Sequence, residues 1–232
     1  MVRIRRFSDP EMLLAELVGR RINYAVAEVG PGWYRDDHRR ILGYEEVGPP
    51  IPGGLFTRAV ELVRGYEFAP PELIRGYFRQ GSLLLGRDMV LEGCFCGVRF
   101  LMGVRVTAVL DSVDAQVSRW GWAYETLDGH LERGRVDYEV GKDHVTGAVE
   151  FRAHSYSRPS HEAHPILRFG WAIFGRRVQL RFYRRVGEQM AALTADRPIT
   201  VAPTVQARLS RPGLTIIDGG RRTPPMTSSS GA

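Results

Sequence analysis

Lysine is almost absent from the sequence, because Lys142 is the single lysine among 32 basic residues and all the others are arginine. The arginines are scattered from Arg3 to Arg222 without forming a basic block, and no motif typical of a nucleic-acid reader accompanies them. The net charge of +6 therefore does not by itself indicate nucleic-acid binding, and we expect no nucleic-acid partner.

Long apolar runs and cysteines are also scarce. No run approaches the roughly 18 uncharged apolar residues that a membrane span needs, and the N-terminal segment lacks the apolar core of a signal peptide. These absences predict a soluble, cytoplasmic protein. The two cysteines, Cys94 and Cys96, are spaced so that they point the same way on a strand, which suits a disulfide poorly, and no second pair completes a zinc site. We expect buried thiols.

Motifs that would announce a cofactor are missing too. The sequence has no glycine-rich phosphate loop after a strand and no GxSxG nucleophile elbow. His161 and His164 enclose one glutamate, but this spacing falls short of the HExxH zinc motif. We therefore expect neither a cofactor nor a metal, and the sequence does not indicate an oligomeric state.

What is present is clear periodicity. Residues 8–18 read as a short helix with a capping box of Ser8 and Glu11, and residues 22–29 read as a strand. Residues 54–68 read as an amphipathic helix. The residues expected on the buried faces are Ile22, Tyr24 and Val26 in the strand, and Phe56, Ala59, Val60 and Val63 in the helix.

From Ser82 to Pro159 the period changes to two, with Gly and Asp turn signals, which predicts an antiparallel meander. VRVTAVL alternates Val104 and Val106, then Ala108 and Leu110, against polar residues. The other face of the later strands carries charges, for which we expect cross-strand ion pairs. One face carries aromatic and hydroxyl side chains: Trp120, Trp122, Tyr124, Thr126, Tyr138, Ser155 and Ser157.

A long amphipathic helix is expected from Pro165 to about Leu193, long enough to cross a sheet. These layers predict an α+β fold in which a curved antiparallel sheet grips a long C-terminal helix around a cavity. We expect an N-terminal helix or arm at 1–20, one helix-grip domain at 21–195 and a flexible Gly/Pro/Ser-rich tail at 211–232. The apolar helix positions are Leu167, Trp171, Phe174, Val178, Phe182, Val186, Met190 and Leu193.

A set of spaced residues carries a family resemblance. It includes Trp120-Gly121, Tyr124, Thr126, Leu127, Gly129, His130, Glu132 and Gly134, then Ser157-Arg158-Pro159, and then Gln179 and Tyr183. This set resembles the uncharacterised domain-of-unknown-function family numbered nineteen-ninety. The resemblance implies a fold similar to the Bet v 1 and START-like helix-grip proteins and little about activity. Glu125, Leu131 and Arg135 depart from the family pattern, which usually has glycine, proline and an acid there.

Polar groups on a buried sheet face cost free energy unless they are paired. The hydroxyl groups therefore either bond one another in a packed core or line a wet or ligand-filled cavity. Arg158, at the end of a strand, would hold a carboxylate or phosphate head group, or cap backbone carbonyls. The candidate ligand-binding residues are Trp122, Thr126, Ser155, Ser157, Arg158 and Trp171.

Three residues are candidates for catalytic proton transfer: Tyr124, His130 and Tyr138. His130 is expected in a turn with Asp128 and Glu132 beside it, where an imidazole can act as general acid or base. The alternative is a turn residue whose ring bonds a backbone carbonyl. The first hypothesis is thus a cofactor-free cyclase, dehydratase or isomerase acting on a small hydrophobic or polyketide-like molecule. The alternatives are a non-catalytic carrier or sensor and, less favoured, a binder of nucleic acid or anionic surfaces.

Overall fold

The fold is described from a computed structural model. It covers residues 2–4, 9–95, 98–160, 165–195 and 214–217, without the side chains of residues 4, 95, 165–175, 178 and 214–217. Several positions singled out in the sequence lie outside these described parts: Ser8, Cys96, His161 and His164, and the side chains of Leu167, Trp171, Phe174 and Val178.

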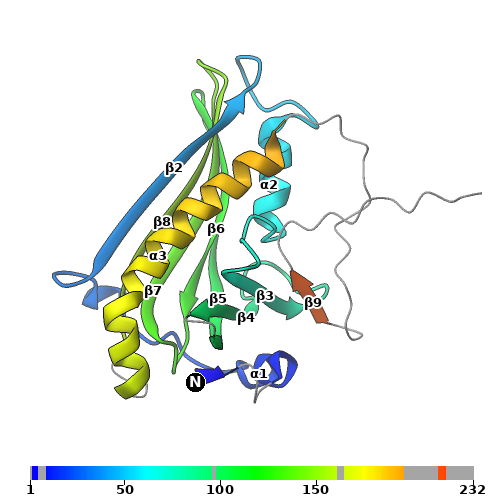
Figure 1. Ribbon diagram of the computed structural model, residues 1–232. Helices are drawn as coiled ribbons and strands as arrows, with labels where there is room; N and C mark the ends of the chain where they lie inside the picture. The colour runs from blue at the N-terminus through cyan, green and yellow to red at the C-terminus, as the bar shows by residue number, and fades with distance from the viewer. Residues whose placement is uncertain (1, 5–8, 96–97, 161–164, 196–213, 218–232) are drawn as a thin grey trace, which may run out of the picture.

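The described strands form one nine-stranded sheet with the order β2-β8-β7-β6-β5-β4-β3-β9, and β1 pairs with β5 (Figure 1). Every pairing is antiparallel, as the period-two pattern predicts. The strands are β1 (Arg3–Ile4), β2 (Tyr34–Tyr44), β3 (Ile74–Arg79), β4 (Asp88–Phe95), β5 (Val98–Val113), β6 (Val117–Thr126), β7 (Glu132–Asp143), β8 (Ala148–Pro159) and β9 (Leu214–Ile217).

Two helices, α2 (Leu55–Arg64) and α3 (Pro165–Thr194), pack on the same face of this sheet, here called the inner face. Figure 1 shows α3 crossing the sheet diagonally in front of β8, β7 and β6. At 30 residues, α3 is about 45 Å long, which is enough for that crossing. The predicted helix-grip architecture is therefore confirmed.

The predicted faces of the central strands are confirmed along β8, where side chains alternate between the buried and half-buried classes. In β5 the alternation fails after a register shift between Val106 and Ala108. Val104 and Val106 are buried, but Leu110 is 39% exposed, because a bulge turns the following side chains to the other face.

The helix α3 is rotated relative to the expected apolar stripe. Phe182 and Leu193 are only half-buried, whereas Val186 and Met190 are buried as expected. Polar residues share the buried side because it faces the hydroxyl groups of the sheet, with which two of them form hydrogen bonds. The buried positions of the described part of α3 are Gln179, Tyr183, Val186, Met190 and Thr194.

The opposite face, the outer face, is covered at one end by α1 (Pro10–Glu16). Leu13 and Leu17 pack there with Val90 and Leu101. The N-cap of α1 is Asp9, whose carboxylate accepts a hydrogen bond from the Glu11 N–H at 2.9 Å, so the expected capping box of Ser8 and Glu11 is wrong. Among the described residues, no helix is long and apolar enough to cross a membrane.

The expected strand at residues 22–29 is wrong. Ile22 forms only an isolated bridge with Leu127, and Val26–Glu28 is a single 3-10 turn in which Val26 is 70% exposed. Tyr24 bonds the outer face of the sheet instead of joining a ladder. The strand in this part of the chain is β2 instead, and it forms the edge of the sheet beside β8.

The predicted flexible tail also needs a correction at residues 214–217. This segment forms β9, which pairs with β3 from Gly76 to Arg79. The backbone of β3 would otherwise present unpaired N–H and C=O groups at this sheet edge, which favours the addition of another strand. The remaining residues of 211–232 lie outside the described part of the chain.

The single lysine is buried in an ion pair. Lys142 is fully buried, and its Nζ lies 2.6 Å from Glu45 Oε2 and donates to the Pro49 carbonyl at 3.0 Å. Glu45 Oε1 also accepts from the Phe56 N–H at 2.7 Å, in the first turn of α2. The pair thus ties the end of β7 to the start of α2.

Candidate functional site

A cavity of 120 Å³ lies between the inner face of the sheet and α3. Strands β3, β4 and β5 supply most of its apolar wall, and α3 closes it with Gln179, Phe182 and Tyr183. Four predicted site residues line it together: Tyr124, Thr126, His130 and Ser157. The apolar lining includes Leu73, Ile74, Leu91, Phe100, Met102, Leu131 and Val136.

Thr126 joins the cavity wall to the N-terminal segment. Its Oγ1 donates to Asn23 Oδ1 at 2.6 Å and accepts from the Gly134 N–H at 2.9 Å. Both roles of the hydroxyl are therefore used by the protein, which positions the β6–β7 hairpin against residue 23. Thr126 can offer a ligand its methyl group more readily than its hydroxyl.

His130 is buried at the turn after β6, where Gly129 takes a positive φ of 80°. Its Nδ1 accepts from the Glu132 N–H at 3.0 Å, so the neutral ring carries its proton on Nε2. Burial lowers the pKa of His130 to about 3. At neutral pH the ring is therefore an uncharged hydrogen-bond donor at the cavity wall. The predicted bond to the backbone is present, although the partner is an amide and not a carbonyl.

Four tyrosines surround the inner end of the cavity. Tyr124 and Tyr183 line it, and Tyr66 and Tyr138 lie behind Tyr124, with ring centroids of Tyr124 and Tyr138 6.0 Å apart. Burial raises the pKa of Tyr124 to about 12, opposed by the nearby hydroxyl groups of Tyr138 and Tyr66. Burial also raises the pKa of Tyr66, Tyr138 and Tyr183 well above the usual value. All four are neutral phenols at pH 7.

The helix contributes a chain of hydrogen bonds to this wall. Tyr183 donates to Ser155 Oγ at 2.6 Å, and Gln179 Nε2 donates to Ser157 Oγ at 3.0 Å. Arg176 donates to Gln179 Oε1 at 3.1 Å and forms a bidentate pair with Asp36 of β2. The serines thus face α3 as the alternation predicts, and they hold the helix in place.

Sequence reasoning did not assign Gln179, Phe182 or Tyr183 to the site. The available signal was the polar pair at 179 and 183, one helical turn apart, opposite the serines of β8. The apolar residues of β3 and β4 gave no signal, because only long-range strand pairing brings them to the cavity.

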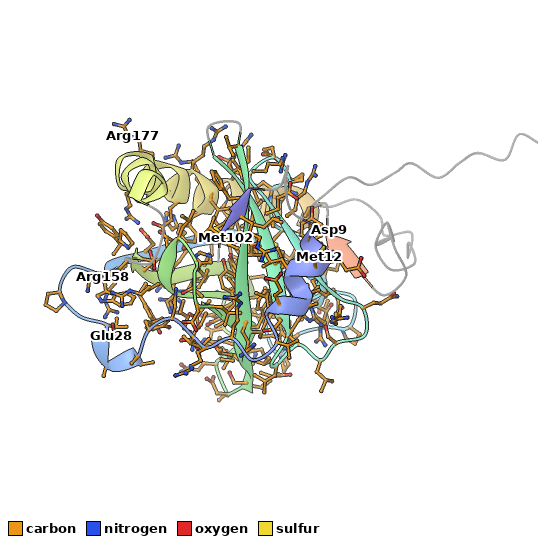
Figure 2. All side chains as sticks on the ribbon, turned by 90° about the horizontal axis from the view of Figure 1, so that it is seen from below. Asp9, Met12, Glu28, Met102, Arg158 and Arg177 are labelled. Atoms are coloured by element: carbon orange, nitrogen blue, oxygen red, sulfur yellow. The ribbon has the colours of Figure 1, made fainter. Side chains whose placement is uncertain are left out.

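Some predicted residues lie elsewhere. Tyr138 is fully buried behind the wall, and Trp122 packs beneath α2 with its Nε1 donating to the Val63 carbonyl at 2.8 Å. Arg158 is half-buried in β8 opposite Arg133 and is not among the lining residues. Figure 2 shows Arg158 at one side of the molecule, away from Met102 near its centre. The expected head-group role of Arg158 thus has no support in the cavity's lining.

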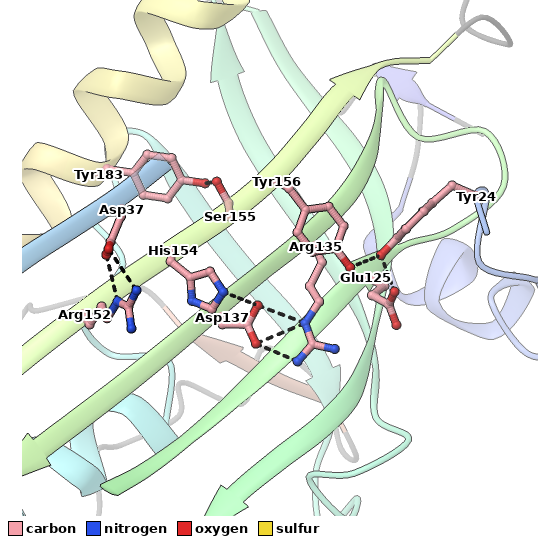
Figure 3. Close-up of polar contacts among 10 residues, drawn as sticks. All are labelled: Tyr24, Asp37, Glu125, Arg135, Asp137, Arg152, His154, Ser155, Tyr156 and Tyr183. Carbon is pink, nitrogen blue, oxygen red and sulfur yellow. Dashed lines mark hydrogen bonds and ion pairs between the residues drawn. The ribbon is translucent and has the colours of Figure 1, made fainter. Parts of the chain in front are cut away.

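The outer face carries cross-strand ion pairs, as expected, between Arg119 of β6 and Glu139 of β7 and between Arg152 of β8 and Asp37 of β2. Figure 3 shows the second of these and a further pair within β7. Arg135 forms a bidentate pair with Asp137 at 2.6 to 3.0 Å, and His154 Nε2 lies 3.5 Å from the same carboxylate. Tyr24 donates to Glu125 and lies 3.0 Å from the hydroxyl of Tyr156. Glu125 and Arg135, which depart from the family pattern, thus find partners on this face.

Cys94 lines the cavity and is half-exposed, so its thiol is not buried as expected. It is a free cysteine. Within the described residues, no group of three or more histidine, cysteine and acidic side chains is arranged to hold a metal ion.

A second hollow, of 260 Å³, lies between α2 and the ends of β5 and β6. Charged side chains, such as Glu61 and Asp111, line it together with apolar ones, and the guanidinium of Arg64 lies 4.6 Å from the ring centroid of Trp120. Of the predicted catalytic and ligand-binding residues whose side chains the structure describes, none lines it. The cavity under α3 is therefore the candidate site.

Comparison with known proteins gives one family match. The sequence profile of a family described as "Domain of unknown function (DUF1990)" matches residues 18–189. No curated protein matches the sequence significantly.

Solved structures with a similar backbone are distant in sequence. Hypothetical protein jhp0584 of Helicobacter pylori has a TM-score of 0.45 and 13% identity, over 75% of this chain and 96% of that one. Major latex-like protein 151 of Panax ginseng has a TM-score of 0.42 and 12% identity, over 71% of this chain and 99% of that one. A norcoclaurine synthase mutant of Thalictrum flavum, in complex with a transition-state analogue, has a TM-score of 0.43 and 7% identity, over 70% of this chain and 94% of that one.

Proposed function

The chain belongs to the DUF1990 family, and we propose that it binds a small, predominantly apolar molecule in the cavity between the sheet and α3. The observation that carries this proposal is the composition of the cavity wall. Apolar side chains from β3, β4 and β5 form one side, and neutral hydrogen-bond donors stand at the other. Ligand sites in proteins typically combine an apolar wall with a few placed polar groups.

The volume of 120 Å³ indicates a ligand portion about the size of one six-membered ring, because cavities of about 150 Å³ accept benzene. Thr126 and Ser157 would contact the ligand directly. Ser155 would act through Tyr183, to which it is bonded, and Trp122 would support the wall from beneath α2. This binding role fits a carrier or sensor without further assumptions.

The test is native mass spectrometry of the purified protein, followed by denaturing extraction and accurate mass of the released molecule. Val136→Phe fills the cavity with a larger apolar side chain, whereas Val113→Phe makes the same change at a site that is 70% exposed. We expect a bound mass in the wild type and in Val113→Phe, and none in Val136→Phe. Equal retention by both variants would place the ligand outside this cavity.

A second candidate function is cofactor-free catalysis of cyclisation, dehydration or isomerisation. The observation that favours it is the presence of Tyr124 and His130 on the wall of one cavity. The pKa of Tyr124 is raised to about 12 and the pKa of His130 lowered to about 3, so neither group is tuned for full proton transfer at neutral pH. They would instead polarise a substrate oxygen while the cavity selects a reactive conformer.

The extracted molecule allows catalysis to be separated from binding. If the protein is an enzyme, Tyr124→Phe and His130→Ala reduce turnover of that molecule by far more than the about three- to tenfold that the loss of one neutral hydrogen bond takes from its binding. Parallel loss of binding and turnover would remove the assigned chemical role. Recovery of an unchanged molecule after incubation would favour the carrier or sensor.

A further inference from the structure

The interior contains hydroxyl groups that the described protein does not satisfy. Tyr138 is fully buried and Tyr66 is 1% exposed, yet the hydroxyl of each lacks a hydrogen-bond partner of good geometry among the described residues. The ring of Tyr138 contacts those of Tyr124 and Tyr66. Unsatisfied buried hydroxyl groups are rare in folded proteins, because each costs free energy.

These hydroxyl groups connect to the cavity through Tyr124 and Tyr183, which line it. The ring centroids of Tyr66 and Tyr124 lie 6.2 and 6.0 Å from that of Tyr138, and Tyr183 lines the same cavity as Tyr124. We call these four phenols the tyrosine cluster. His130 offers a further N–H at the cavity wall. The wall is therefore rich in uncharged donors.

Charges near the cluster disfavour an anion. Glu132 lines the cavity together with Tyr124 and Tyr183, and after burial its carboxylate is a further cause of their raised pKa. A negative charge placed between the two tyrosines would be repelled by this carboxylate. The guanidinium groups of Arg135 and Arg176 are both engaged in bidentate pairs, with Asp137 and Asp36. A carboxylate ligand would find like charge and no uncommitted arginine among these groups.

We propose that the tyrosine cluster is a subsite for an uncharged oxygen acceptor, so that the ligand is a ketone, aldehyde or similar neutral carbonyl compound with an apolar ring. This inference rests on the proposed function, because it names the chemical class that the cavity selects. The carbonyl accepts from Tyr124, and the hydroxyl groups of Tyr138 and Tyr66 extend the hydrogen-bond chain behind it. The ring contacts Phe100 and Met102 on the apolar wall.

Three probes of similar size separate the alternatives: acetophenone carries a neutral carbonyl, cumene is apolar, and benzoate is an anion. Their dissociation constants are measured on the full chain by ligand-observed NMR. We expect acetophenone to bind at least about tenfold more tightly than benzoate. Tyr124→Phe should weaken acetophenone about three- to tenfold, the usual worth of one neutral hydrogen bond, and leave cumene within about twofold.

A second readout reports the bond itself. The infrared stretch of ¹³C-labelled acetophenone carbonyl should move to lower frequency on binding and move back in Tyr124→Phe. Tyr138→Phe should reduce the shift partly, which keeps the proposal testable if Tyr124→Phe does not fold. Tyr156→Phe removes a hydroxyl from the outer face of β8 and should change neither affinity nor frequency.

The outcomes distinguish the subsite from the cavity. If cumene binds but acetophenone shows no dependence on Tyr124 or Tyr138, the cavity stands and the carbonyl subsite is wrong. Benzoate binding as tightly as acetophenone would overturn the preference for a neutral group. If no probe binds the folded wild-type protein, both the subsite and the proposed function fail.

Discussion

The same strands carry uncharged polar groups on the inner face of the sheet and charged groups on the outer face. On the inner face, tyrosine and serine hydroxyl groups lie among apolar rings and remain neutral. On the outer face, polar residues carry full charges and meet in pairs, as Arg135 does with Asp137 and Arg152 with Asp37. Charge is tolerated where water screens it, or where it is buried in an ion pair as at Lys142 and Glu45, whereas the tyrosine and serine hydroxyl groups of the inner face are uncharged.

Tyr24 and Tyr138 make the comparison within one residue type. Tyr24 bonds a carboxylate and a second tyrosine on the outer face, so its hydroxyl is fully used. Tyr138 is buried more deeply but has no such partner. Whether a buried hydroxyl group has a structural role therefore depends on its hydrogen-bond partners and not on burial alone.

The largest contrast is expected from truncation on each face. Phe68 is fully buried, and its ring lies 4.6 Å from that of Tyr138 and 5.6 Å from that of Phe151. Phe68→Ala should reduce the free energy of unfolding by about 3 to 5 kcal/mol, because it leaves a cavity. Arg152→Ala, which breaks an exposed pair, should cost under about 1 kcal/mol. Urea denaturation measures both, and comparable losses would contradict the division between the faces.

The next effect comes from acid acting on the inner face. His130 has a folded pKa of about 3, below its unfolded value, so its contribution to stability is complete above about pH 6.5 and is lost as the pH falls towards 3. Between pH 6.5 and pH 4 this amounts to about 3 kcal/mol. His130→Gln should flatten that part of the stability curve measured by urea denaturation. An unchanged slope in His130→Gln would show that other groups cause the acid sensitivity.

A smaller effect distinguishes the two tyrosines. Tyr24→Phe should cost about 1 to 2 kcal/mol, because it removes a hydrogen bond to a carboxylate. Tyr138→Phe should change stability by less than about 1 kcal/mol in either direction, because its hydroxyl has no well-placed partner to lose. Thermal unfolding of the ligand-free protein compares the two. A loss at Tyr138 equal to that at Tyr24 would indicate a bound water or a stronger bond within the tyrosine cluster.

The smallest expected effect on stability comes from protonation of a carboxylate on the outer face. Hydrogen bonds from Arg152 lower the pKa of Asp37 to about 2, so its contribution is complete above about pH 4 and disappears as the pH falls through 2. The carboxylate is 41% exposed, which limits the loss to under about 1 kcal/mol. Asp37→Asn should therefore alter the stability measured at pH 5 only slightly. A change of several kcal/mol at pH 5 would mean that the exposed pair holds β2 in place.

The central sheet was predictable because β6, β7 and β8 alternate strictly, and one face of each carries aromatic and hydroxyl side chains. The edge strand β2 was missed, since its sequence YRDDHRRILGY has little apolar alternation and one of its sides pairs with nothing in the sheet order. The neighbouring segment around Tyr24 looked more like a strand, but its side chains serve to cover the outer face.

For the candidate site, the hairpin residues Tyr124, Thr126 and His130 could be placed from sequence, because they lie within one local unit. Gln179 and Tyr183 were missed although their spacing of one helical turn was a signal, because the helix stripe was assigned from apolar residues and this helix turns polar ones inward. The protonation state of His130 could not be predicted from the sequence either, because it depends on burial by strands that are distant along the chain.

Because Lys142 is buried, its accessibility to a reagent or protease reports on local unfolding of the protein. Apart from the amino terminus, this sequence offers a single primary amine, and the fold encloses it completely. A lysine-specific protease can cleave this chain at one internal position, and only when the end of β7 has opened from α2. The rate of that cut, followed on a gel as one band becoming two, would report the population of the opened state, or the opening rate itself when cleavage outpaces reclosing.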